Sequence, residues 1–243
     1  MKPLIIACCL LSIVFAETQM SPQQREEAKL ALQNPDLYDG DMLGVDDNLD
    51  RNAIPPARYR WADAKVPYII DKSLKDSTDI IKEAFENYHK NTCVRFVPRT
   101  TERDYIKIFE GKGCYSAVGR IGNPQSLSLG DGCMYVGTVI HELGHALGFY
   151  HEQSRSDRDE YLIIYLENAD ESMQRNFRKL APKQNILYNT FDYKSIMIYG
   201  NKAFSNNDKD TMVARNGEKL LDPYEKQGMT ASDIERVRKM YKC

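Results

Sequence analysis

The spacing of apolar residues changes along this chain, and each spacing predicts a type of element. After Ser73, a suitable N-cap residue, apolar side chains recur at helical intervals, at Ile80, Ile81, Ala84, Phe85 and Tyr88. This pattern predicts an amphipathic helix. Short segments that cluster or alternate apolar residues predict strands, at residues 66–70, 94–98 and 105–109, with a weaker one at 125–129.

Two more helices are predicted in the second half of the chain. One runs from about Met134 to Gly148, and the last begins at Ser232 and ends near Tyr241. Between them the chain after His151 is polar and irregular. This order of elements predicts one α+β domain, in which a twisted mixed sheet and two helices lie above a cleft and a looser lower lobe carries the C-terminal helix. Residues 52–243 are sufficient to bury a proper core.

The first sixteen residues follow a different pattern. Lys2 precedes an apolar run from Leu4 to Phe15, and Val14 and Ala16 are small residues around a plausible cleavage point. This is typical of a secretory signal peptide, because the run is too short to span a bilayer. A signal anchor left in place is the alternative. No other apolar run approaches bilayer length, so we expect a secreted, extracellular protein without membrane contact.

The charges are distributed unevenly, although the composition is that of a soluble globular protein. Residues 17–51 hold nine acidic and three basic residues, a net charge of −6 in a chain whose total is −2. The chain from Asn52 onward is therefore mildly basic, at +3. Electrostatic complementarity predicts that the acidic segment is a propeptide lying across the following domain. We expect no nucleic-acid partner.

Four cysteines remain once the first sixteen residues are removed: Cys93, Cys114, Cys133 and Cys243. An even number in an exported chain indicates two disulfides. The residues alone leave all three connectivities open.

The segment from His141 to His151 carries the clearest chemical signal. His141 and His145 are four residues apart, so a helix directs both imidazoles to one point. Gly148 permits the left-handed conformation that ends a helix, which allows His151 to return as a third ligand. Three imidazoles with an open fourth position are typical of a catalytic zinc site, so we predict one Zn²⁺ per chain. Glu142 is suitably placed to be the general base toward a water there.

An amphipathic helix with incidental histidines is the alternative interpretation. Three of the chain's four histidines, however, lie within these eleven residues. The fourth, His89, has no such neighbours, and we expect an ordinary surface or half-buried side chain.

These motifs, from about Arg51 to Cys243, resemble the astacin family of metzincin zinc peptidases. Glu152 and the residues up to Asp159 are similar to the family signature that follows the third histidine, and residues 193–199 are similar to its Met-turn. Ile198 departs from the pattern, since many members have histidine there. That position is not a ligand, so the change bears on substrate selection rather than on the chemistry.

The resemblance implies a two-lobed, metzincin-like domain that is a zinc metalloendopeptidase. It also implies that Tyr199 assists at the oxyanion, whereas a purely packed aromatic is the alternative, and that Met197 forms an apolar floor below the imidazoles. The disulfides that it implies are Cys93–Cys243 and Cys114–Cys133. An extended peptide substrate is implied to pair with an exposed strand edge near Tyr115–Val118.

The resemblance further implies latency. Tyr38 to Asp41 resembles a propeptide motif with tyrosine in place of phenylalanine, in which Asp41 takes the open zinc position. A solvated acidic turn is the alternative. We expect an activating protease to cleave between Arg51 and Asn52, after which the new α-amino group of Asn52 folds toward Glu152. The expected parts are a signal peptide (1–16), a propeptide (17–51) and a peptidase domain (52–243).

Two other functions compete with this interpretation: a binding or inhibitory protein that keeps an inactive peptidase fold, and a zinc hydrolase with a non-peptide substrate. The intact His141, Glu142, His145 and His151 argue against the first. We expect a monomer whose partners are a protein or peptide substrate and its activating protease. The sequence does not indicate which substrate or biological role applies.

Overall fold

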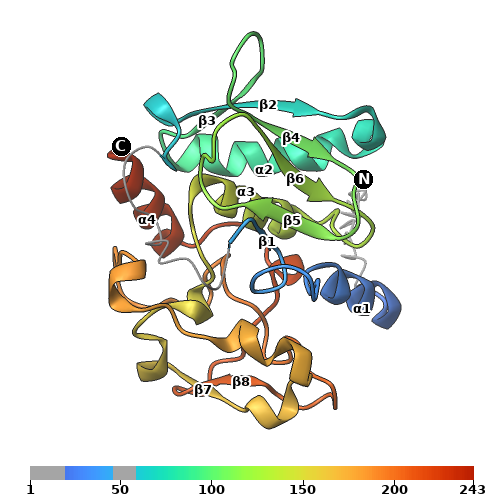
Figure 1. Cartoon of the computed structure of the whole chain (residues 1–243), viewed down its shortest axis with the longest axis vertical. Helices are drawn as coiled ribbons and strands as arrows, with labels where there is room; N and C mark the ends of the chain where they lie inside the picture. The colour runs from blue at the N-terminus through green and yellow to red at the C-terminus, as the bar shows by residue number, and fades with distance from the viewer. Residues whose placement is uncertain (1–19, 46–58) are drawn as a thin grey trace, which may run out of the picture.

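A six-stranded mixed sheet forms the upper lobe of the computed structural model, which describes residues 20–45 and 59–243 (Figure 1). The strands lie in the order β1-β5-β6-β4-β2-β3, and only the β5–β6 pair is antiparallel. Their bounds are β1 Met42–Leu43, β2 Lys65–Ile70, β3 Arg95–Pro98, β4 Tyr105–Phe109, β5 Cys114–Ala117 and β6 Pro124–Leu129. The four predicted strands are therefore confirmed to within one residue at each end, and the mixed sheet is as expected.

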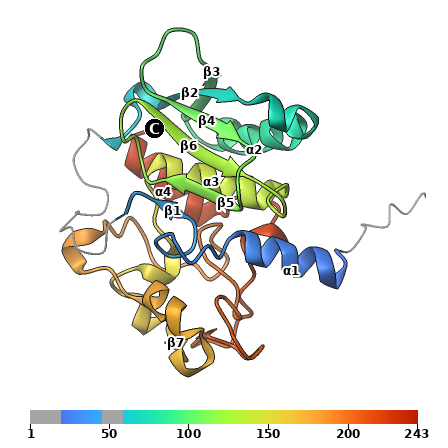
Figure 2. The same ribbon diagram turned by 45° about the vertical axis from the view of Figure 1, so that its right-hand side comes forward.

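Helices α2 (Thr78–Asn91) and α3 (Val136–Leu147) lie together on one face of this sheet (Figures 1 and 2). The apolar face of α2 and almost all of α3 are buried in a single hydrophobic core. The buried Tyr88 hydroxyl of α2 donates a hydrogen bond to the Ile140 carbonyl of α3 at 2.8 Å. This core holds α3 rigidly below the sheet.

The predicted cap of α2 was wrong. Asp71, not Ser73, caps a short 3-10 helix at Lys72–Ser77, because its carboxylate accepts the Ser73 backbone N–H at 3.1 Å. Within this 3-10 helix, the buried Leu74 leaves the helical region of φ and ψ, so the turn that Asp71 caps is not continuous with α2. The α-helix itself begins only at Thr78.

The lower lobe is mostly irregular, as the sequence predicted. Its sheet has only two short antiparallel strands, β7 (Leu162–Ile164) and β8 (Met212–Ala214), among several 3-10 turns. Helix α4 (Ala231–Tyr241) closes the chain and is one residue longer at its start than expected. Thr230 and Asp233 form its capping box.

Residues 20–45, here called the N-terminal segment, pack between the two lobes (Figure 2). The segment begins with α1 (Pro22–Ala31), which Ser21 caps, and ends after β1. Ala28 and Leu32 are buried in the core of the domain. The prediction that this acidic part of the chain lies across the domain agrees with this packing.

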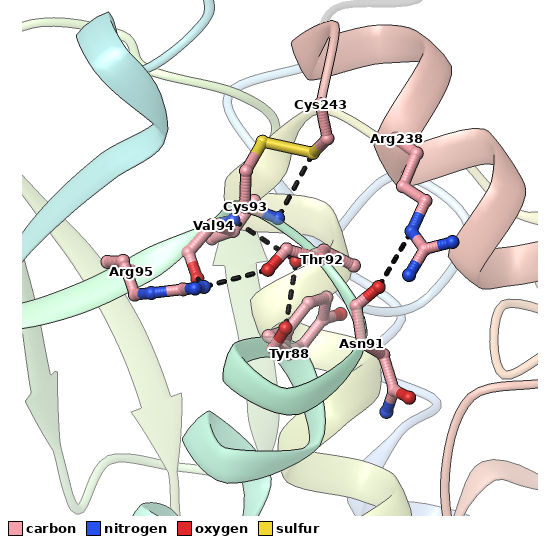
Figure 3. Close-up of a disulfide and its surroundings, with 8 residues drawn as sticks. All are labelled: Tyr88, Asn91, Thr92, Cys93, Val94, Arg95, Arg238 and Cys243. Carbon is pink, nitrogen blue, oxygen red and sulfur yellow. Dashed lines mark hydrogen bonds between the residues drawn. A yellow bond between two sulfur atoms is a disulfide. The ribbon is translucent and has the colours of Figure 1, made fainter.

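The structure selects one of the three possible disulfide connectivities. Cys93 is joined to Cys243, across 150 residues, and Cys114 to Cys133, across 19 residues. Figure 3 shows the first bond, which links Cys93, just after α2, to Cys243, two residues after α4. Among the described residues, no helix has the length and apolar character needed to cross a bilayer.

Candidate metal centre

The three predicted histidines converge at the end of α3. Their Nε2 atoms lie 3.1 Å apart for His141 and His145, and 3.2 Å apart for each of the two pairs with His151. Gly148 ends the helix with φ of +113°, in the left-handed region that favours glycine, so the chain turns and returns His151 to the site. All three side chains are buried.

The other nitrogen of two imidazoles is fixed by the backbone. His141 Nδ1 donates to the Ile196 carbonyl at 2.8 Å, and His145 Nδ1 donates to the Phe149 carbonyl at 2.7 Å. Because a carbonyl can only accept, each Nδ1 carries the hydrogen and each Nε2 presents a lone pair. Tetrahedral zinc with Zn–N bonds of about 2.0–2.1 Å separates its nitrogens by about 3.3 Å. The donor set therefore fits zinc.

Asp41 is the fourth member of this group. Its Oδ2 atom lies 3.0 Å from His141 Nε2 and 3.2 Å from His151 Nε2, and its Oδ1 atom lies 3.3 Å from His145 Nε2. The ligand atoms of all four residues lie within 4.8 Å of one another. Asp41 is fully buried, so the alternative of a solvated acidic turn was wrong.

The charges of this group depend on one another. Burial raises the pKa of Asp41, but the electrostatic interaction with His151 and the contacts with the other two imidazoles outweigh burial and hold the pKa well below its usual range. Burial lowers the pKa of His151, yet the charge of Asp41 and the approach of Asp39 Oδ2 to within 3.5 Å of its Nδ1 raise it to about 9. Burial lowers the pKa of His141 to about 3. Without a metal ion the site thus retains a proton, which a divalent cation would replace.

Glu142 is buried beside the histidines, and neither carboxylate oxygen has a hydrogen-bond partner in the described parts of the chain. Burial, followed by the charge of Asp41, raises its pKa well above the usual range. A carboxylate that is not tied to protein donors remains available to take a proton.

Tyr199 also reaches the site. It is buried, its ring packs 4.5 Å from that of His151 (centroid to centroid), and its hydroxyl is in hydrogen-bond contact with Asp41 Oδ2 and, at 2.9 Å, with the Leu32 carbonyl. Both acceptors belong to the N-terminal segment. Packing alone therefore does not describe this side chain.

Asp39 is a member of the site that sequence reasoning missed. Its Oδ2 atom accepts a hydrogen bond from Ser154 Oγ at 2.6 Å and lies 3.5 Å from His151 Nδ1. The turn at Asp39 and Gly40, with φ of +49° and +92°, places Asp39 and Asp41 on two sides of the same imidazole. The signal for it in the sequence was the presence of another aspartate, besides Asp41, in the Tyr38–Asp41 motif.

The Met-turn lies directly below α3. A Cβ atom on Gly144 would lie 2.5 Å from Met197 Sδ, so the glycine allows the thioether to approach the helix between two histidines. Ile198 is fully buried in the core, so any influence on substrate selection would be indirect.

Glu152, the residue after the third histidine, already has cationic partners. Arg236 donates from two nitrogens to its two carboxylate oxygens, each at 2.7 Å, and Arg155 donates at 3.1 Å. Burial nevertheless raises the pKa of Glu152. The expected amino-group partner, at Asn52, and the expected cleavage site at Arg51 lie outside the described residues.

A cavity of about 60 Å³ lies beside His151 and Glu152, and Asp41 is not among the residues that line it. Its lining is largely apolar and aromatic and includes Phe149, Ile186, Leu187, Tyr188, Arg236 and Val237. It is therefore distinct from the position that Asp41 occupies beside the histidines.

The strand edge at Tyr115–Val118 is not free in this structure. β1 pairs with β5 in parallel, with Met42 opposite Ser116 and Leu43 opposite Ala117. The Ser116 N–H also donates to the Asp41 carbonyl at 3.0 Å. The expectation of an exposed edge thus has to be corrected, because the N-terminal segment covers it.

Comparisons with known proteins give consistent matches. The model of the Astacin peptidase family matches residues 53–242. The chain is 43% identical over 217 residues to Astacin-like metalloprotease toxin 1 of Loxosceles intermedia, covering 85% of this chain and 81% of that protein. It is 41% identical over 198 residues to Zinc metalloproteinase nas-13 of Caenorhabditis elegans, covering 80% of this chain but 44% of that protein.

A solved structure agrees with the fold. The hatching enzyme zinc-protease HCE-1 of Oryzias latipes superposes with a TM-score of 0.70 and 35% sequence identity. The match covers 82% of this chain and 100% of that chain.

Proposed function

The chain belongs to the astacin family of zinc endopeptidases, and we propose that it is secreted as a latent precursor that cleaves extracellular proteins once an activating protease has removed its N-terminal segment. His141, His145 and His151 are the three histidines of its zinc site. The observation that supports latency best is the contact of Asp41 with all three. The carboxylate lies where a catalytic zinc site needs an open position.

Further contacts of the N-terminal segment support its role as a propeptide. β1 covers the edge of β5, and Leu32 and Asp41 engage the Tyr199 hydroxyl. Arg25 forms an ion pair with Glu225 at the start of the segment. We assign the propeptide to residues 17–51, behind a signal peptide at 1–16 and before the peptidase domain at 52–243. The two disulfides suit an oxidising, extracellular environment.

The catalytic roles follow from the positions of the side chains. When bound, zinc polarises the scissile carbonyl group and makes water more acidic. Glu142, whose oxygens are free of protein donors, takes a proton from the attacking water and passes it to the departing amine. Tyr199, released from Asp41, donates a hydrogen bond from its hydroxyl group to the developing oxyanion. Met197 only packs below the imidazoles.

The substrate site follows from what the N-terminal segment covers. When β1 leaves, the edge of β5 at Tyr115–Val118 offers unpaired backbone groups to an extended peptide. Strand addition gives main-chain affinity to many sequences, and neighbouring side chains provide selectivity. We therefore propose protein or peptide substrates that bind in an extended conformation.

Activation is proposed to occur by cleavage between Arg51 and Asn52. Glu152, which lines the largely apolar cavity described above, is the proposed acceptor for the ammonium group of the new chain end. Because Arg236 and Arg155 already balance the charge of Glu152, the apolar lining supports this step more than the charge does.

Replacing Glu142 with Gln tests the enzymatic function. The amide cannot accept the water proton, so hydrolysis of casein or gelatin by the processed protein should fall by about 10²–10⁴-fold while zinc content is retained. A zymogram with and without chelator tests the wild type in parallel. The two competing functions, an inactive peptidase fold and a non-peptide hydrolase, both predict that no chelator-sensitive band appears.

Latency is tested by two other substitutions. Arg51→Ala should yield a secreted protein without activity. Asp41→Ala should yield some activity before cleavage, because the position beside the histidines becomes free and the Tyr199 hydroxyl keeps only its contact with the Leu32 carbonyl. Full activity of uncleaved Arg51→Ala with Asp41 intact would contradict the proposed switch.

A further inference from the structure

A lysine with an unusual environment connects the Met-turn to the segment that packs against the start of α3, where a Cβ on Gly137 would lie 2.3 Å from the Lys226 carbonyl oxygen. The side chain of Lys226 is half-buried, and its Nζ atom donates to the Ser195 carbonyl at 2.7 Å and the Ile198 carbonyl at 2.6 Å. These two carbonyls enclose Ile196 and Met197 in the chain. One ammonium group therefore holds both ends of the turn.

The ammonium gains no ion pair in return for its burial. Of the described residues, none places a carboxylate oxygen within salt-bridge distance of Nζ, although Asp222, Asp233, Asp192 and Glu225 face it from its own and neighbouring segments. Burial lowers the pKa of Lys226 to about 8 against the effect of these carboxylates. A shift in this direction means that the fold disfavours the charged form.

The turn leads directly to a zinc ligand. The Ile196 carbonyl, which lies between the two carbonyls that Lys226 holds, accepts the Nδ1–H of His141. The N–H side of the same turn is held by Asp233 of α4, which accepts from Ser195 Oγ at 2.6 Å and from the Ile196 N–H at 2.8 Å. Asp233 and Lys226 thus fix the turn through its donors and its acceptors, respectively.

We propose that Lys226 is a positioning residue of the zinc site, whose ammonium fixes the Met-turn and thereby the carbonyl that orients His141. The Ile196 carbonyl holds a metal-ligating histidine through its second nitrogen, and partners of this kind typically affect metal affinity by about 10–100-fold. The inference rests on the zinc-binding role of His141. It does not depend on the peptidase activity.

The test uses the full-length, zinc-loaded protein and measures the rate of zinc release to a chromogenic chelator. Lys226→Met removes the donors while keeping an unbranched side chain, and should release zinc at least about 10-fold faster than the wild type. Lys226→Arg keeps a charged donor and should stay within about 3-fold of the wild type. Lys194→Met is the matched control, because Lys194 lies in the same loop with a 75% exposed side chain paired to Glu218.

A pH series separates positioning from a merely structural role. Raising the pH through about 8 neutralises Lys226 but not an arginine, so the ratio of zinc release rates, wild type over Lys226→Arg, should rise between pH 7 and 9.

The proposal is overturned if Lys226→Met releases zinc within about 3-fold of the wild type, or if Lys226→Arg is impaired as strongly as Lys226→Met. If Lys226→Met is not recovered as folded protein, Lys226→Gln replaces it under the same criteria. Because zinc release is measured without substrate, failure here is distinguishable from failure of the Glu142→Gln experiment.

Discussion

The two sides of the zinc site are built in different ways. On the helix side, α3 holds His141 and His145 inside an apolar core shared with α2 and the sheet. On the loop side, residues 149–230 hold His151 and the Met-turn with little regular structure. Two charged side chains of α4, Arg236 and Asp233, bind this segment. Apolar packing positions two ligands, and a polar network positions the third.

The difference determines what each side tolerates. Changes of volume disturb a close-packed helix side, because cavities and overpacking both destabilise it. On the loop side, a single missing partner leaves a buried charge uncompensated, which is more destabilising than the loss of a hydrogen bond. Substitutions on each side therefore probe two kinds of sensitivity.

The largest expected effect comes from the disulfide that joins the two sides. Replacing Cys93 and Cys243 with Ala frees α4 from the end of α2 and should lower the free energy of unfolding by about 5 kcal/mol, because it opens a loop of 150 residues. The matched pair, Cys114→Ala with Cys133→Ala, opens 19 residues within the upper lobe and should lower it by about 3 kcal/mol. Urea denaturation measures both free energies of unfolding. Equal losses would mean that the disulfide between the two sides stabilises the fold no more than the disulfide within the upper lobe.

The next effect concerns the charged network. Arg236→Met should lower the free energy of unfolding by about 3–5 kcal/mol, because Glu152 loses the partner that donates to both of its oxygens. Arg238→Met is the control on the same helix, since Arg238 is exposed. Its loss should stay within about 0.5 kcal/mol in the same denaturation experiment. A mild Arg236→Met would place the stability of the loop side in its packing instead.

A smaller effect is expected where the two sides touch. Gly144→Ala should destabilise by about 1–3 kcal/mol, because the new Cβ meets Met197 Sδ. Helix propensity alone predicts the opposite sign, a gain of about 1 kcal/mol. Thermal unfolding decides between them. Adding Met197→Ala should remove most of the penalty, and an additive double mutant would contradict the contact.

The smallest effect tests the helix caps. Thr230→Ala should weaken α4 by about 1 kcal/mol, because the Thr230 hydroxyl accepts the Asp233 N–H. Ser77→Ala, at the start of α2, should change stability by less than about 0.5 kcal/mol, since Ser77 makes no side-chain cap hydrogen bond. Differential scanning calorimetry resolves the two, and equal losses would show that capping does not distinguish the lobes.

The contrast also explains how far the sequence could predict the molecule. Helices α2, α3 and α4 have enough residues to display a period, and the histidine spacing is local, so these elements and the convergence of the three imidazoles were predictable. β1, β7 and β8 have two or three residues each, too few for any pattern.

The remaining features depend on contacts that are distant in the chain. Arg236 meets Glu152 across 84 residues, and Lys226 meets the Met-turn across about 30. No spacing rule relates such pairs, since each depends on how the loop side folds. Asp39 was visible beside Asp41, but its position next to His151 depends on two consecutive left-handed residues.

In the latent precursor that we propose, the contacts of Asp41 have a consequence for activation. One carboxylate lies against the three imidazoles and also engages the Tyr199 hydroxyl. The open zinc position that water needs and the Tyr199 phenol that we assign to the oxyanion therefore become available in the same step. A precursor built in this way has no partly active intermediate in this step. The activity of a sample should therefore rise with the fraction of molecules that have been activated, and not with a gradual increase in the activity of each molecule.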